Sequence, residues 1–131
     1  MISTRGRYAV RIMIELAGNY GKPPLPMKTV AARQGISLKY AERILPDLVA
    51  GGLIEGSRGK GGGYYLTRRP EKYTIFDILR CSEGDLAPVA CLSGGSSGCE
   101  RACECRALPL WKGYYELTEE YFSGVKLSDL L

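Results

Sequence analysis

Four of the five cysteines in this 131-residue chain are concentrated in one short segment, where they could bind metal or react as thiols. They are spaced as Cys91-x7-Cys99-x3-Cys103-x-Cys105, and Cys81 stands apart from them. An odd number of cysteines, in a sequence with no secretory leader that we can identify, argues against a disulfide framework and favours metal or thiol chemistry. Histidine is absent, so His-based zinc sites and hydrolytic triads are excluded.

Three kinds of site are open to the clustered thiols. Soft thiolate ligands select iron–sulfur clusters or zinc, and a cluster tolerates irregular spacing. Structural zinc sites usually have regular two-residue spacings, which this segment lacks. Metal-free thiols acting as redox sensors are the third alternative. Cys81 lies in a predicted helix, where a lone cysteine most often serves as a small buried apolar side chain.

The charge of the chain divides into a basic front and an acidic back. Residues 1–72 contain 13 Lys and Arg against 5 Asp and Glu, a net charge of +8, whereas residues 73–131 have a net charge of −4. A polyanion is therefore the expected partner of the front half only. No apolar stretch is long enough to predict a membrane span, and we expect a cytoplasmic protein.

The elements that must position these groups are mainly helices. Apolar periodicity and capping residues predict helices over residues 3–19, 27–34, 37–50, 75–81 and 108–122. Two β-prone runs, at 53–55 and 64–66, flank a glycine-rich turn and predict a hairpin. Residues 84–106 show no periodicity, and nothing in them builds a core.

The order helix, turn, helix and basic hairpin predicts a winged helix-turn-helix. Gly35 takes the turn, and the helix capped by Ser37 would enter the major groove of DNA by its N-terminal end. Arg43 could reach a guanine edge or a phosphate, and Glu42 could accept from a cytosine amine. Ser37 could place its backbone amide against a phosphate. The complete set of expected contacts on this helix is Ser37, Leu38, Lys39, Tyr40, Glu42 and Arg43.

The hairpin would supply the second DNA contact. Arg58, Gly59 and Lys60 lie in its turn, where glycines let the loop approach DNA closely. An arginine at such a tip suits a narrow minor groove. The alternative is a solvated charged helix beside a flexible hairpin, but the basic residues cluster at the two places that the motif predicts.

These residues resemble the bacterial Rrf2 family of transcription regulators. The matching strings are Ser3-Thr4-Arg5-Gly6-Arg7-Tyr8-Ala9-Val10, Gln34-Gly35-Ile36-Ser37-Leu38-Lys39-Tyr40-Ala41-Glu42 and Arg58-Gly59-Lys60-Gly61-Gly62-Gly63-Tyr64, and the likeness continues through the cysteine segment to Leu110-Trp111 and the closing Leu127-Ser128-Asp129-Leu130-Leu131. The resemblance implies a homodimer joined by a long C-terminal helix. It also implies that Arg58 enters the minor groove.

The resemblance further implies a 2Fe-2S cluster on Cys91, Cys99 and Cys105. Family members complete the cluster with a histidine or an aspartate, at positions where this chain has Leu108 and Arg7, neither of which can ligate. Cys103 is the remaining sulfur and a possible fourth ligand. Zinc is the alternative metal.

We therefore expect a mainly α fold with a small β-hairpin wing, divided into three parts. Residues 1–80 would form the DNA-binding domain, 81–107 a cysteine-rich sensor loop, and 108–131 the dimerisation helix and C-terminal segment. The expected function is that of a transcriptional repressor, which binds double-stranded DNA and senses iron–sulfur or redox status. The alternatives are a regulator of cysteine metabolism or of thiol redox status without a cluster, and a zinc-stabilised winged-helix interaction module. An enzyme is not expected, because no nucleophile elbow or phosphate loop is present.

Overall fold

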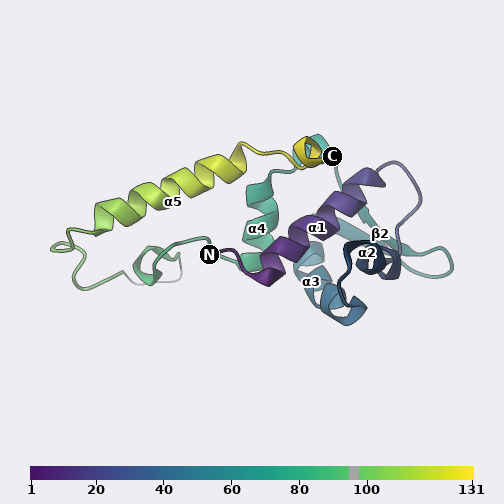
Figure 1. Cartoon of the computed structure of the whole chain (residues 1–131), viewed down its shortest axis with the longest axis horizontal. Coiled ribbons are helices and arrows are strands. Elements are labelled where there is room, and N and C mark those ends of the chain that lie inside the picture. The colour runs from purple at the N-terminus through teal and green to yellow at the C-terminus, as the bar shows by residue number, and fades with distance from the viewer. Residues whose placement is uncertain (95–97) are drawn as a thin grey trace.

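The computed structural model describes residues 1–94 and 98–131. Residues 95–97, which belong to the predicted sensor loop, lie outside the described residues. The elements in chain order are α1 (Thr4–Gly18), α2 (Met27–Gln34), α3 (Leu38–Ala50), β1 (Ile54–Ser57), β2 (Gly63–Leu66), η1 (Pro70–Lys72), α4 (Ile75–Glu83), η2 (Ala90–Leu92), α5 (Leu108–Ser123) and η3 (Leu127–Leu130). The predicted helical fold with a hairpin is confirmed (Figure 1).

Helices α1 to α4 surround one apolar core. Helices α1, α3 and α4 begin at a capping side chain: Ser3 accepts from the amide of Gly6, and Ser37 accepts from the amide of Tyr40 at 3.0 Å, whereas α2 has no side-chain cap. The turn between α2 and α3 is made by Gly35, whose positive φ of 64° favours glycine. The largest fully buried side chains are Tyr73, Ile12, Met13, Leu16, Ile44, Leu48, Ile54, Ile78, Leu127 and Val30.

The hairpin is antiparallel and is fastened to the helical body by a third extended segment. Ile54 pairs with Leu66 at its base, and Ser57 pairs with Gly63 at its tip. Leu25 forms an isolated bridge with Tyr64 through two main-chain hydrogen bonds, 2.9 and 3.0 Å long. A Cβ at Gly63 would come within 2.4 Å of the Leu25 main chain, so only glycine permits this approach.

The C-terminal end of the chain returns to the core of the N-terminal part. The amide of Leu127 donates to the carbonyl of Tyr73 at 3.0 Å, and the Leu127 side chain is fully buried. Helix α4 carries the predicted capping box of Thr74 and Asp77 and continues to Glu83. The predicted boundary at residue 80 therefore falls inside a helix, and the closing residues pack with the DNA-binding part.

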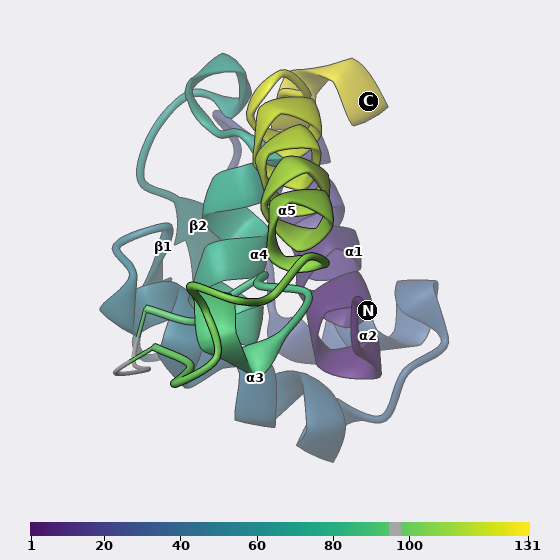
Figure 2. The same ribbon diagram turned by 90° about the vertical axis from the view of Figure 1, so that its left-hand side faces the viewer.

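Helix α5 projects from the rest of the molecule (Figure 1). Its axis points toward the viewer in Figure 2, with the segment that leads into it running below its free end. None of its residues is buried, and its exposed apolar side chains are Leu110, Trp111, Tyr114, Leu117 and Tyr121. Within the described ranges, no helix is both long and apolar enough to cross a lipid bilayer.

Candidate functional site

The N-terminal half of α3 presents its polar side chains to solvent. Ser37, Lys39, Glu42 and Arg43 are all exposed, and Leu38 is 37% exposed. The opposite side of the helix is anchored in the core by Ala41, Ile44, Leu45 and Leu48. Helix α3 therefore has the two faces that a groove-reading helix requires: one packed and one free to meet base edges.

Tyr40 departs from the expected position on the solvent face. It is half-buried, and its ring packs edge-to-face on Tyr8 of α1, with centroids 5.5 Å apart. The helical periodicity of the sequence placed Tyr40 on the polar face. An aromatic ring beside a neighbouring helix is stabilised more by packing on that helix than by exposure to water. Tyr40 thus supports the position of α3 through its ring.

Arg11 of α1 holds the end of α2 just before the turn. Its Nε donates to Oε1 of Gln34 at 2.8 Å, and its guanidinium also donates to the Gln34 main-chain carbonyl. The Gln34 side-chain amide donates in turn to Glu15 at 2.6 Å. Arg11 also lies over the ring of Tyr8, 5.1 Å from its centroid. This network, which sequence reasoning missed, fixes the angle at which α3 leaves the turn.

Arg5 pairs with an acidic side chain on α3. Its Nε donates to Asp47 at 3.0 Å, and its terminal nitrogen donates to the carbonyl of Arg43 at 3.1 Å and also pairs with Asp47. An unpaired carboxylate here would repel the DNA backbone. The pair therefore removes a negative charge from the side of α3 that carries Arg43.

The wing tip lies beyond the hairpin with its predicted contact residues free. Arg58, Gly59 and Lys60 are exposed, and the φ of Gly59 is 88°. The base of the wing is fastened by Tyr73, whose buried hydroxyl donates to the carbonyl of Leu53 at 2.7 Å and accepts from the amide of Arg68 at 3.1 Å. The wing therefore combines an open basic tip with a fixed base.

The four clustered cysteines lie between α4 and α5 and are mostly accessible. Cys91 is half-buried in the turn η2, whereas Cys99, Cys103 and Cys105 are exposed. Thiols of this kind suit a cluster chemically. In residues 1–94 and 98–131, no three Cys, Asp or Glu side chains are close enough together to hold a metal ion. The donor types therefore fit a cluster, but ligation would require this segment to bring its sulfurs together.

Cys81 is separate from this group and differs in chemistry. It is half-buried rather than fully buried, and its thiol donates to the main-chain carbonyl of Asp47 at 2.8 Å. Burial raises the pKa of the Cys81 thiol, and the nearby Asp47 adds to that effect. Cys81 therefore packs between α3 and α4, but it is less buried than the sequence predicted and also donates a hydrogen bond.

Asp85 is a second residue that sequence reasoning missed. Its carboxylate accepts from the amides of Ala87 and Gly94, at 2.7 and 2.8 Å, and from the hydroxyls of Ser93 and Tyr115, at 3.0 and 3.1 Å. The Gly94 and Ala87 amides, in that order, lower the pKa of Asp85 to about 2. The bond to Ala87 is a local turn that an Asp followed two residues later by a free amide can predict. The bond to α5 leaves no local signal.

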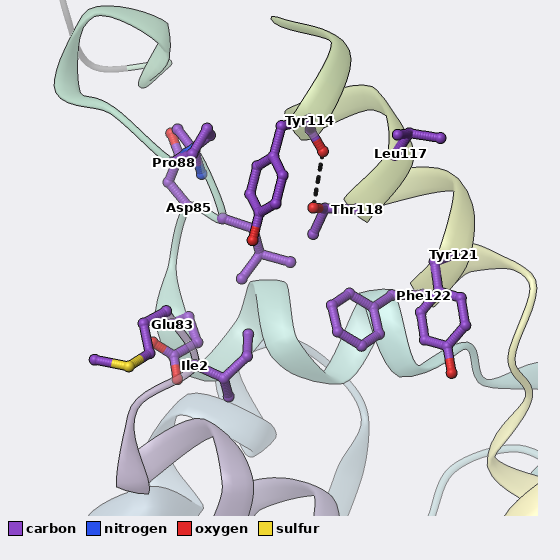
Figure 3. A pocket seen from close by; sticks show the side chains of 12 residues that line it. Ile2, Glu83, Asp85, Pro88, Tyr114, Leu117, Thr118, Tyr121 and Phe122 are labelled. Atoms are coloured by element: carbon purple, nitrogen blue, oxygen red, sulfur yellow. Dashed lines mark hydrogen bonds between the residues drawn. The ribbon is translucent and has the colours of Figure 1, made fainter. Parts of the chain in front are cut away.

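A groove of about 560 Å³ lies between α5 and the body of the molecule (Figure 3). Tyr114, Leu117, Tyr121 and Phe122 line it from α5. The opposite wall comprises the start of the chain, the end of α4 and the following residues, namely Met1, Ile2, Glu83, Asp85, Leu86, Ala87 and Pro88. The groove, which also contains the carboxylates of Glu83 and Asp85, adjoins the exposed apolar side chains of α5, and exposed apolar surface of this extent is typical of contacts with another protein.

The chain is similar to known regulators over nearly its whole length. The family described as Rrf2, iron-dependent transcriptional regulator, matches residues 2–131. The HTH-type transcriptional regulator IscR of Aliivibrio salmonicida is 29% identical over 130 residues, which are 99% of this chain and 76% of that protein.

Two solved structures share both fold and sequence with the chain. CymR, the global cysteine regulator of B. subtilis, is 35% identical, with a TM-score of 0.80 over 99% of this chain and 95% of its own. IscR of T. potens is 30% identical, with a TM-score of 0.76 over 99% of this chain and 85% of its own. These relatives are transcription regulators, the class that the sequence predicted in preference to an enzyme. The chain belongs to the Rrf2 family of helix-turn-helix transcriptional regulators.

Proposed function

We propose that this regulator is a homodimeric repressor that acts in the cytoplasm and couples iron–sulfur or redox status to the occupancy of a near-palindromic DNA site. The observation that carries the proposal is the joint exposure of a polar helix face, a basic wing tip and three thiols on one small chain. The three parts divide the work as DNA-binding domain, sensor segment and dimerisation helix. Each part has its own test.

The DNA contacts come from α3 and the wing. Lys39 and Arg43 neutralise phosphates or bind guanine edges, Glu42 selects cytosine, and Arg58 enters the minor groove with Lys60 beside it. Ser37 and Leu38 lie at the entrance of the helix to the groove, and Gly59 allows the close approach of the tip. A binding selection on genomic fragments should return one sequence motif for the wild type. An Arg43→Ala variant should lose preference at one base position and retain the motif elsewhere, and fragments retained without any shared motif would refute specific reading.

The dimer is formed by the α5 stripe of one copy against the groove of the other. Leu110, Tyr114, Leu117 and Tyr121 recur at intervals of three or four residues, so they share one side of the helix. Such a stripe is costly to leave in water, and a second copy of the chain would cover it. Two recognition helices in this dimer would lie about one helical turn of DNA apart, ~34 Å.

The sensor is the segment that contains Cys91, Cys99 and Cys105, with Cys103 as the fourth sulfur. These residues would hold a 2Fe-2S cluster, which would supply sensitivity to oxidation and to iron supply. The exposure of three of these thiols supports ligation, because ligands must be free to converge. Asp85 bonds the start of this segment and also Tyr115 of α5, and three of the four clustered cysteines are exposed to solvent.

Protein purified without oxygen tests the sensor directly. We expect absorption in the visible range with iron and sulfide in equal amounts, and their loss in Cys91→Ala but not in the control Cys81→Ala. Colourless protein with stoichiometric zinc would refute the cluster and support the zinc site instead. A second candidate, a response to cysteine or thiol status without metal, is favoured by the 35% identity to CymR. It predicts metal-free protein whose DNA binding changes on thiol oxidation.

A further inference from the structure

The carboxylate of Asp85 joins two segments that the proposed function assigns to different tasks. Its Oδ2 accepts from the Ser93 hydroxyl and the Gly94 amide, which immediately follow the turn that contains Cys91. Its Oδ1 accepts from the Tyr115 hydroxyl of α5 and from the Ala87 amide. One side chain thus bonds the beginning of the cysteine segment through one oxygen and the dimerisation helix through the other.

Hydrogen bonds to an ionised carboxylate are stronger than those between neutral groups, and four of them on one side chain restrain each other's geometry. The low pKa of Asp85 keeps it ionised throughout the physiological range. The Tyr115 pKa is raised, first by burial and then by the bond to Asp85, so the phenol remains a donor. Both partners are therefore held in the protonation states that the contact needs.

We propose that Asp85 is a positioning residue through which the cysteine segment and α5 fix each other's place, so that a change at Cys91 is transmitted to the dimerisation helix. The role of this link in signalling rests on the proposed sensor function. The link itself is present in the chain without metal or DNA. Because coupling between two sites is reciprocal, a change on α5 should also alter the reactivity of the Cys91 thiol. The connection is continuous: it runs along the chain from Cys91 to the Ser93 hydroxyl and the Gly94 amide, and through the Asp85 carboxylate to the Tyr115 hydroxyl.

The rate of alkylation of Cys91 in the metal-free, reduced full-length protein measures this link. Tyr115→Phe removes only the hydroxyl that bonds Asp85 and should accelerate the reaction of Cys91 with iodoacetamide about threefold to tenfold, the equivalent of one hydrogen bond. Peptide mass spectrometry measures the alkylation of each cysteine separately. Exposed Cys99 controls for the activity of the reagent, and half-buried Cys81 controls for a general loss of structure. Tyr20→Phe, an exposed tyrosine elsewhere, is the matched control and should leave Cys91 unchanged.

Two further variants separate the charge from the contact. Asp85→Asn should increase the alkylation rate of Cys91 as Tyr115→Phe does. Glu116→Gln, which removes a neighbouring exposed charge from α5, should leave that rate unchanged. In the reverse direction, alkylation of Cys91 should lower the Tyr115 pKa, followed by NMR of ring-labelled tyrosine. An unchanged Cys91 rate in both Asp85→Asn and Tyr115→Phe, or an equal acceleration of Cys81, would overturn the link.

The link and the sensor function can fail separately. If Cys91 responds to Tyr115→Phe but DNA affinity in the wild type is the same with and without bound metal, the link stands and the proposed sensing is wrong. If DNA affinity depends on the metal and the Asp85→Asn variant retains that dependence in full, transmission does not pass through Asp85 and the proposal is overturned. Retained metal content with a lost affinity difference in Asp85→Asn is the expected result.

Discussion

Removal of the Tyr73 hydroxyl tests most directly how the base of the wing is held. The side chain is fully buried at the junction of the hairpin, η1 and α4, and its hydroxyl bonds the carbonyl of Leu53 at 2.7 Å, the amide of Arg68 at 3.1 Å and the hydroxyl of Thr67 at 3.2 Å. Tyr73→Phe keeps the ring and removes only this oxygen. The change leaves main-chain groups without their partner in a place where water has little access.

The expected cost is about 1.5–3 kcal/mol of the free energy of unfolding, because buried groups that lose a partner retain their desolvation penalty. The Leu53 carbonyl keeps a weak bond from the Thr67 amide at 3.4 Å, which limits the loss. The midpoint of thermal unfolding should fall by about 5–10 °C for a chain of this size. Urea unfolding measures the free energy and a temperature scan measures the midpoint, both followed by circular dichroism at one fixed protein concentration.

Tyr65→Phe is the matched control for this measurement. Tyr65 lies in the same hairpin, but its hydroxyl bonds Glu55 in solvent at 2.8 Å, so its loss should change the free energy of unfolding by less than about 0.5 kcal/mol. If Tyr73→Phe and Tyr65→Phe have equal effects, the buried hydroxyl does not hold the wing and our account of its base is wrong.

Three other outcomes follow from the surfaces and thiols of the chain. Arg58→Ala should weaken operator binding and reduce the slope of log affinity against log salt by about 1, whereas Arg80→Ala on α4 should leave the slope unchanged; an unchanged slope for both refutes the wing contact. Leu117→Asp should convert dimers to monomers in analytical ultracentrifugation, and a persistent dimer would place the interface elsewhere. Because burial raises the pKa of the Cys81 thiol, a smaller fraction of Cys81 is thiolate at pH 8 than for a cysteine of ordinary pKa. Exposed Cys99 should therefore be alkylated before Cys81 at this pH. Equal rates would contradict this assignment.

The elements of the fold could be predicted because their signals are local. Ser37 caps α3, Thr74 and Asp77 form the capping box of α4, and Gly35 makes the turn, each within four residues of its partner. Apolar periodicity then decides which face is buried. Helix α4 extends to Glu83, past the predicted end at residue 81, since Ile78, Leu79 and Ser82 are buried against the other helices.

The contacts that position the site could not be predicted, because they join residues far apart in the chain. Arg11 reaches Gln34, and Asp85 reaches Tyr115 across 30 residues. A charged side chain on a helix is most often solvated, so its type does not reveal a buried or shared role. Tyr40 shows the same limit, since only the position of Tyr8 on α1 decides that its ring packs instead of facing solvent.

The distribution of these contacts constrains how the sensor segment could act on DNA. Helix α3 is held to α1 by Arg5 and by the Tyr8–Tyr40 pair, and the Arg11–Gln34 network holds the end of α2 that precedes it, so the position of α3 within one copy is resistant to change. Helix α5 has no buried residue and projects from the body. A signal from the cysteine segment would therefore act most easily on α5 and so on the distance between the two recognition helices of a dimer. Since half-sites tolerate little error in spacing, a small rotation at α5 in the proposed dimer would change operator affinity without any change in α3.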